Sequence, residues 1–153
     1  MFHRYDYEAE FYPSLNRLPL DVRRKLDVTG IKISLKDWLA FSMEERMALC
    51  HMPCDNEEER QVFSSFVDLL ARRYFSKPTQ KIAPLENTAW SELAVPDAVA
   101  QKSAALSHVV SAGEWRRFPA HHRYALYKSA VSDNQPEAFE KVLIQLRKLT
   151  PRD

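Results

Sequence analysis

The sequence is poor in glycine: of its 153 residues, only Gly30 and Gly113 are glycines. Loops that cradle phosphate need several glycines, because the backbone N–H groups must approach the ligand closely. Two isolated glycines therefore exclude a P-loop and a dinucleotide-binding turn of the GxGxxG type. Scarce glycine combined with nine prolines instead predicts helices that are joined by stiff connections.

The sequence also lacks long apolar runs and an excess of charge. No uninterrupted apolar run approaches the roughly 20 residues that span a bilayer, and the N-terminus is charged from its first residues. We therefore expect no secretory signal, no membrane partner and a cytoplasmic location. The 22 basic and 21 acidic side chains give a net charge of +1, which provides no general attraction to nucleic acid.

Two stretches of the sequence resemble each other at an offset of 77 residues. Between positions 18 and 49, nine of 32 residues are identical to the residue 77 positions later, where chance would give about two. The matches include Trp38 with Trp115, although the sequence has only three tryptophans, and we predict that both side chains are buried because they supply a large apolar area. They also include Ser34 with Ser111, each followed three positions later by an acidic residue, as in a capping box.

This repeat and the spacing of apolar residues predict an all-α fold, a compact helical domain made of two duplicated helical units with pseudo-two-fold symmetry. The copies cover about 18–75 and 95–150, joined by a connector over 76–94, within a single domain of residues 1–153. The predicted helices lie at 19–29, 35–41, 43–52 and 56–75 in the first copy, and at 96–107, 112–117, 119–132 and 135–149 in the second.

Local signals predict how these helices begin, end and pack. Gly30 is expected to end the first helix in a left-handed conformation, Asn56 to cap the fourth, and Pro136 to lie in the first turn of the last. The aromatic-rich leader over 2–12 has no counterpart in the second copy and is expected to be extended, packed along the helices, or used at an interface. The last helix of each copy is expected to bury one apolar face, Val62, Phe66, Val67 and Leu69 in one and Phe139, Leu143, Ile144 and Leu146 in the other.

Two groups of side chains resemble metal or catalytic sites but have simpler interpretations. Cys50, His51 and Cys54 provide three ligands at most, whereas a structural zinc site needs about four. We predict that Cys50 is a small buried hydrophobe and that both cysteines are free of disulfide and metal. His121 and His122 fall in the first turn of a predicted helix and are expected to be solvated. We therefore predict no catalytic residues, no metal and no cofactor.

The residues that differ between the two copies are better candidates for a binding site. The segment from Arg23 to Lys32 is polar, whereas residues 100–109 at the offset of 77 are bland. Arg46 recurs as Arg123 between apolar positions, and both side chains are expected to lie over the repeated tryptophans, stacked on them or paired with a carboxylate. The candidates for contact with a partner or ligand are Arg23, Lys25, Asp27, Lys32 and Arg46.

Much of the chain resembles a known family. The resemblance is carried by the run from Leu18 to Lys32 and by the N-terminal Tyr7-Glu8-Ala9-Glu10-Phe11. It continues with Trp38, Phe41-Ser42, Glu45-Arg46, Leu49, Pro53-Cys54-Asp55, Pro96, Trp115 and the segment from Arg123 to Leu126. On these residues the sequence resembles the nitrate-reductase-associated protein family. That family is defined largely by genes near those for nitrate reductase and molybdenum-cofactor synthesis, and the resemblance implies no catalytic residues.

Three functions are compatible with the sequence and this resemblance. The first is a non-catalytic accessory protein of assimilatory nitrate reductase, which would assist its maturation, cofactor loading or regulation as a protein partner. The alternative is a molybdopterin- or small-molecule-handling protein with a pocket between the two repeats. The third, a transcriptional regulator, is disfavoured by the neutral charge. The oligomeric state does not follow from the sequence.

Overall fold

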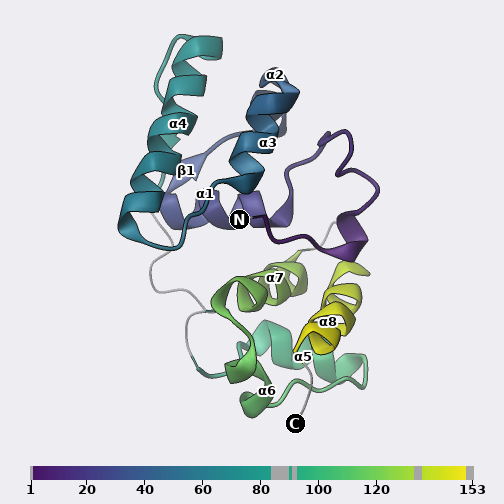
Figure 1. Ribbon diagram of the computed structural model, residues 1–153. Helices are drawn as coiled ribbons and strands as arrows, with labels where there is room; N and C mark the ends of the chain where they lie inside the picture. The colour runs from purple at the N-terminus through teal and green to yellow at the C-terminus, as the bar shows by residue number, and fades with distance from the viewer. Residues whose placement is uncertain (1, 84–89, 91–92, 133–135, 151–153) are drawn as a thin grey trace. The chain divides into compact units, whose positions relative to one another are not determined.

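The computed structural model describes residues 2–83, 90, 93–132 and 136–150, and these residues are mostly helical (Figure 1). Of them, 62% lie in helices and 3% in strands, which agrees with the predicted all-α class. Contacts divide the chain into two compact units. The first unit comprises residues Met1–Arg4 and Glu8–Glu86, and the second comprises Tyr5–Tyr7 and Asn87–Asp153. Each unit has helices and buried apolar residues of its own.

The first unit contains four α-helices at nearly the predicted positions. They are α1 (Leu20–Thr29), α2 (Leu35–Ala40), α3 (Met43–His51) and α4 (Glu57–Phe75). Two short strands, β1 (Ile31–Lys32) and β2 (Gln80–Lys81), pair antiparallel and were not predicted. Strands of two residues show no alternation of apolar and polar residues, so the sequence pattern could not indicate them.

The caps of these helices follow the predicted chemistry. Gly30 ends α1 with a φ of 71°, in the left-handed region that favours glycine. Ser34 and Asp37 form a reciprocal capping box at α2. The Asn56 side chain accepts a hydrogen bond from the backbone N–H of Glu59 in α4 at 2.9 Å. A second capping box, which the prediction missed, starts α3 at Ser42. Because caps satisfy backbone donors within a few residues, short sequence patterns are enough to predict them.

Trp38 lies at the centre of the first unit, as predicted. Its side chain is fully buried, and its indole Nε1 donates to the carbonyl oxygen of Leu15 at 2.7 Å. The contact ties the segment that follows the leader to α2, because an indole N–H that is buried needs an acceptor. The other residues of this core are Val22, Leu26, Ile31, Phe41, Leu49, Cys50, Cys54, Phe63, Val67 and Leu70.

The second unit also contains four α-helices and a buried tryptophan. Trp115 is fully buried, which confirms the prediction. Pro136 precedes the last helix instead of lying in its first turn, because the N-cap residue of that helix is Glu137. A 3-10 helix, η1 (Asp6–Glu8), contributes residues to both units. The α-helices are α5 (Asp97–Ala105), α6 (Ala112–Arg117), α7 (Ala120–Val131) and α8 (Ala138–Leu149).

The predicted apolar faces of the last helices were partly wrong. Val62 and Leu69 of α4 are both 60% exposed, and Ile144 of α8 is 43% exposed. The sequence places two apolar stripes side by side on α4, and consecutive residues are turned by about 100°, so an alignment wrong by one residue selects the wrong stripe. The buried faces consist of Phe63, Val67, Leu70 and Ala71 in α4, and of Ala138, Phe139, Val142, Leu143 and Leu146 in α8.

These buried faces match at an offset of 76 rather than 77. Phe63 corresponds to Phe139, and Leu70 corresponds to Leu146, so the second half has one residue fewer before its last helix. The earlier helices keep the offset of 77, since α2 and α6 have the same length and start 77 positions apart. The internal duplication, with its pseudo-two-fold symmetry, stays a prediction that superposition of the two units would test. The organisation as a single domain also stays a prediction.

Candidate functional site

The polar segment from Arg23 to Lys32, which was predicted as a binding site, has some side chains at the surface and others in the interior. Arg23 and Lys32 are exposed, and Asp27 is half-buried. Arg23 and Asp27 lie one turn apart on the same side of α1, because residues four apart in a helix are neighbours. Lys32 follows Gly30 on β1 and pairs there with Gln80. Arg23, Asp27 and Lys32 are called the α1–β1 face below.

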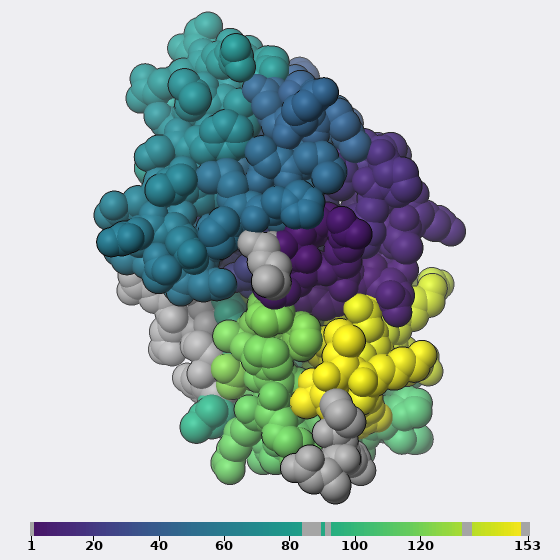
Figure 2. Space-filling view, viewed as in Figure 1, coloured from purple at the N-terminus to yellow at the C-terminus, as the bar shows by residue number. Residues whose placement is uncertain are grey.

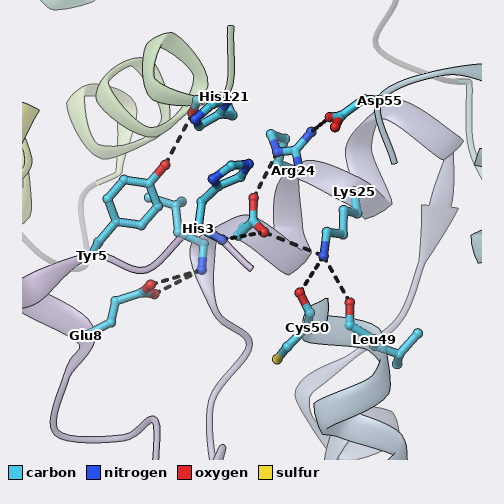
Figure 3. Close-up of polar contacts among 11 residues, drawn as sticks. His3, Tyr5, Glu8, Arg24, Lys25, Leu49, Cys50, Asp55 and His121 are labelled. Carbon is cyan, nitrogen blue, oxygen red and sulfur yellow. Dashed lines mark hydrogen bonds and ion pairs between the residues drawn. The ribbon is translucent and has the colours of Figure 1, made fainter. Parts of the chain in front are cut away.

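Lys25 does not reach this face, because its side chain is fully buried. Its Nζ donates to the carbonyl oxygens of Leu49 at 3.1 Å and Cys50 at 2.6 Å (Figure 3). Both carbonyls belong to the last turn of α3, where the backbone has no helical donors left. A cation at that end is also favoured by the helix dipole. Lys25 therefore acts as a side-chain cap that joins α1 to α3.

Asp21 balances the buried positive charge. Its carboxylate is 1% exposed, lies 3.5 Å from Lys25 Nζ and accepts a hydrogen bond from Arg24 Nε at 3.0 Å. It also accepts from the backbone N–H of His3 at 3.1 Å, and Arg24 lies 3.7 Å from Asp55 (Figure 3). Burial lowers the pKa of Lys25, and Asp21 opposes this shift. We call Asp21, Arg24 and Lys25 the buried charge cluster.

The leader supplies the cap that α1 otherwise lacks. Pro19 is the N-cap residue of α1 and makes no side-chain cap. The carboxylate of Glu8 accepts instead from the backbone N–H of Leu20, at 3.0 and 3.3 Å from its two oxygens, and from the Tyr12 hydroxyl at 2.8 Å. Glu8 is 4% exposed, and burial raises its pKa to about 7, although both hydrogen bonds oppose the shift.

Among the described residues, Arg46 is bound to backbone carbonyls rather than stacked on a tryptophan or paired with a carboxylate. Its Nε donates to the carbonyl oxygen of Phe41 at 3.1 Å, and its Nη1 donates to those of Ser14 at 3.2 Å and Leu15 at 3.1 Å. A guanidinium can bind several carbonyl oxygens at once because it offers several donors in one plane. The contacts with Ser14 and Leu15 fix the segment that follows the leader, and the sequence could not indicate them because they join residues 32 and 31 positions apart.

The two cysteines are buried, as predicted for Cys50. Both side chains are at most 1% exposed, and both thiols are free. Burial raises the pKa of Cys50 to about 12 and that of Cys54 to about 11. Because the thiolate is the reactive form, these values disfavour nucleophilic or redox chemistry at neutral pH.

The two adjacent histidines are less exposed than predicted. His121 and His122 are half-buried, and their ring centroids lie 4.3 Å apart. Tyr5 packs against them within the second unit: its hydroxyl donates to the His121 carbonyl oxygen at 3.3 Å, and its ring centroid lies 6.5 Å from that of His122. The sequence pattern missed this burial because the covering residue comes from the leader, 116 positions away.

Within the residues that the structure describes, no three His, Cys, Asp or Glu side chains are grouped so as to hold a metal ion. None of the helices described is long and apolar enough to cross a membrane. Sequence reasoning missed Glu8, Asp21 and Arg24. The spacing of Asp21 from Arg24 and Lys25 was a usable signal, since residues three and four apart meet on a helix. Their burial could not be predicted, because it depends on contacts between residues far apart in the sequence, such as His3 with Asp21 and Glu8 with Leu20.

Comparison with known proteins gives one match. A protein-family model described as conserved nitrate reductase-associated protein matches residues 4–146. The match covers Glu8, the buried charge cluster and most of both units. No curated protein matched the chain. No solved structure matched it either.

Proposed function

This chain belongs to the family of conserved nitrate reductase-associated proteins, and from that membership we propose that it is a non-catalytic accessory protein of assimilatory nitrate reductase. It would bind the enzyme and assist its maturation, cofactor loading or regulation. The family name links the chain to nitrate reductase. The observation that carries the accessory role is that the polar segment from Arg23 to Lys32 has two kinds of side chain. Lys25 is buried, whereas Arg23 and Lys32 are exposed at the surface.

The α1–β1 face is the proposed contact with the partner. Arg23 and Lys32 are exposed, so their charges are accessible to another protein, and the half-buried Asp27 lies one turn from Arg23 on α1. The corresponding positions of the second half are Ala100, Ala104 and Val109, which folding alone evidently tolerates. Lys25 and Arg46 are left out of this face, because their donors are already bound to carbonyl oxygens of the same unit.

The alternative, a molybdopterin- or small-molecule-handling protein, gains no support from the buried cations. Arg24 and Lys25 converge on Asp21 and on backbone carbonyls, so their charge is balanced within the protein. A phosphate group would have to displace these partners from an enclosed position, which costs several kcal/mol. The alternative stays a prediction, and mass spectrometry of small molecules bound to the purified protein tests it.

The accessory role is tested by replacing Arg23, Asp27 and Lys32 with alanine together. Cells that lack the wild-type gene and carry this triple variant should grow normally on ammonium but poorly on nitrate, with nitrate reductase activity reduced several-fold. A matched control is Lys36→Ala combined with Glu44→Ala, two exposed charged residues elsewhere in the first unit. Melting curves of both variants should lie close to wild type, because surface substitutions usually shift stability little. A folded triple variant that supports full growth on nitrate would contradict the proposed face.

A further inference from the structure

α4 exposes a second apolar stripe beside the one that it buries. Val62 and Leu69 are both 60% exposed, and Phe66 between them is only partly buried against the core. Spacings of four and three residues place these side chains on one side of the helix. α4 lies at the surface of the first unit, where its side chains are visible along the teal part of Figure 2. We call Val62, Phe66 and Leu69 the apolar stripe of α4.

The charges at the two ends of this stripe have opposite signs. Glu57, Glu58 and Glu59 occupy the first turn of α4, whereas Arg72 and Arg73 occupy its last turn. Both arginine side chains are exposed, and among the described residues Arg72 pairs with Asp68 at 2.8 Å and Arg73 with Glu45 at 3.3 Å. Such exposed pairs contribute little stability and can be exchanged for others. One stripe therefore runs from an acidic end to a basic end.

We propose that the apolar stripe of α4 binds the same stripe of a second copy of this chain in an antiparallel arrangement. A two-fold axis between Ser65 and Phe66 sets Val62 against Leu69 of the partner subunit. The same axis sets Glu58 against Arg73 of the partner subunit, so one pairing satisfies both apolar and charged contacts. Interfaces with two-fold symmetry require such self-complementarity. Ser65, a small exposed residue at the crossing point, lets the helices approach closely.

The resulting dimer is weak and depends on concentration. A pair of helices crossing over a few turns buries less than the roughly 800 Å² per partner of a standard interface. We expect dissociation constants of about 10 to 500 µM. Because charge pairs contribute, association should weaken as salt is raised. This proposal does not depend on the accessory role, since it concerns α4 and not the α1–β1 face.

Sedimentation velocity of the full chain over a range of concentrations tests the apolar part. Wild type should shift from monomer to dimer, and Leu69→Lys should lower the association constant at least tenfold. Ile144→Lys is the matched control, because Ile144 is an exposed aliphatic residue on the last helix of the other unit. A wild type that stays monomeric throughout, or a dimer that Ile144→Lys abolishes and Leu69→Lys does not, would overturn the proposal.

Charge reversal tests the antiparallel pairing. Glu58→Arg and Arg73→Glu each put like charges at both ends of a symmetric dimer, so each variant alone should associate more weakly than wild type. Mixed in equal amounts, the two variants restore opposite charges at both ends and should form a heterodimer. If the mixture associates no better than the separate variants, the helices do not pair in this direction.

Discussion

The first helices of the two units both begin after a proline, but they bury different kinds of side chain. α1 carries three buried charged side chains, Asp21, Arg24 and Lys25, each at most 7% exposed. α5 buries Val99 and Ser103 instead. Lys102, which corresponds to Lys25 at the offset of 77, is only half-buried. Similar local sequence therefore gives helices of similar length whose buried faces have different chemistry.

The leader accounts for part of this difference. It has no counterpart in the second half of the sequence, and in the first unit its residues cover the start of α1. The backbone N–H of His3 binds Asp21, and the carboxylate of Glu8 binds the N–H of Leu20. The burial of Asp21 thus involves the added segment, whereas Lys25 is buried against the end of α3, and neither contact follows from the helical pattern that the halves share. Four predictions test this comparison.

The two tryptophans should behave alike, because each is fully buried in its own unit. Trp38→Ala and Trp115→Ala should each lower the free energy of unfolding of their unit by about 3–5 kcal/mol, through lost burial and the cavity left behind. Denaturant melts followed by far-UV circular dichroism measure this. A melt that either substitution leaves unchanged would show that its tryptophan is dispensable for packing.

The two lysines should behave differently. Lys25→Met leaves the carbonyls of Leu49 and Cys50 without their donor and leaves Asp21 less compensated, so it should cost about 3 kcal/mol. Lys102→Met is the matched control and should cost less than about 1 kcal/mol, because Lys102 is half-buried. Equal costs in chemical denaturation would mean that the buried charge cluster adds nothing to stability.

The comparison also shows which features the sequence could predict. The helices and their caps depend on contacts within a few residues, which is why α6 and the caps at Ser34 and Asn56 were predicted correctly. The burial of Lys25 depends on α3, 24 and 25 positions away, which no pattern around position 25 reveals. The stripe that α4 buries could not be selected either, since the sequence offered two apolar stripes and the structure buries the one that contains Phe63.

Glu8 should make the stability of the first unit depend on pH. Burial raises its pKa from 4.5 to about 7, so between these values the native state holds a proton that the unfolded state has lost. The contribution of Glu8 to the free energy of unfolding is therefore complete below about pH 4.5. It falls as the pH rises to about 7, by at most about 3 kcal/mol. Glu8→Gln should remove this dependence relative to wild type.

The control for Glu8 is Glu10→Gln, because Glu10 is an exposed carboxylate two residues away. Denaturant melts of wild type and both variants at several pH values separate the effect of Glu8 from that of other titrating groups. The stability difference between wild type and Glu8→Gln should change through this range, whereas the difference for Glu10→Gln should stay constant. If the stability difference were constant for both variants, protonation of Glu8 would not contribute to the stability of the first unit.

The smallest difference concerns the acidic residues three positions after the capping serines. The Asp37 carboxylate accepts a hydrogen bond from the backbone N–H of Ser34, its own N-cap residue. Glu114 instead binds Arg147 of α8 at 2.8 and 3.0 Å, while the Ser111 hydroxyl still caps α6. Glu114→Gln should therefore cost about 1–2 kcal/mol, because it weakens a contact between two helices at a residue only 4% exposed. Asp37→Asn should cost about 0.5 kcal/mol, since its amide oxygen can still accept from Ser34. A double-mutant cycle with Arg147→Met decides the matter: a coupling energy near zero would mean that Glu114, like Asp37, acts only within its own helix.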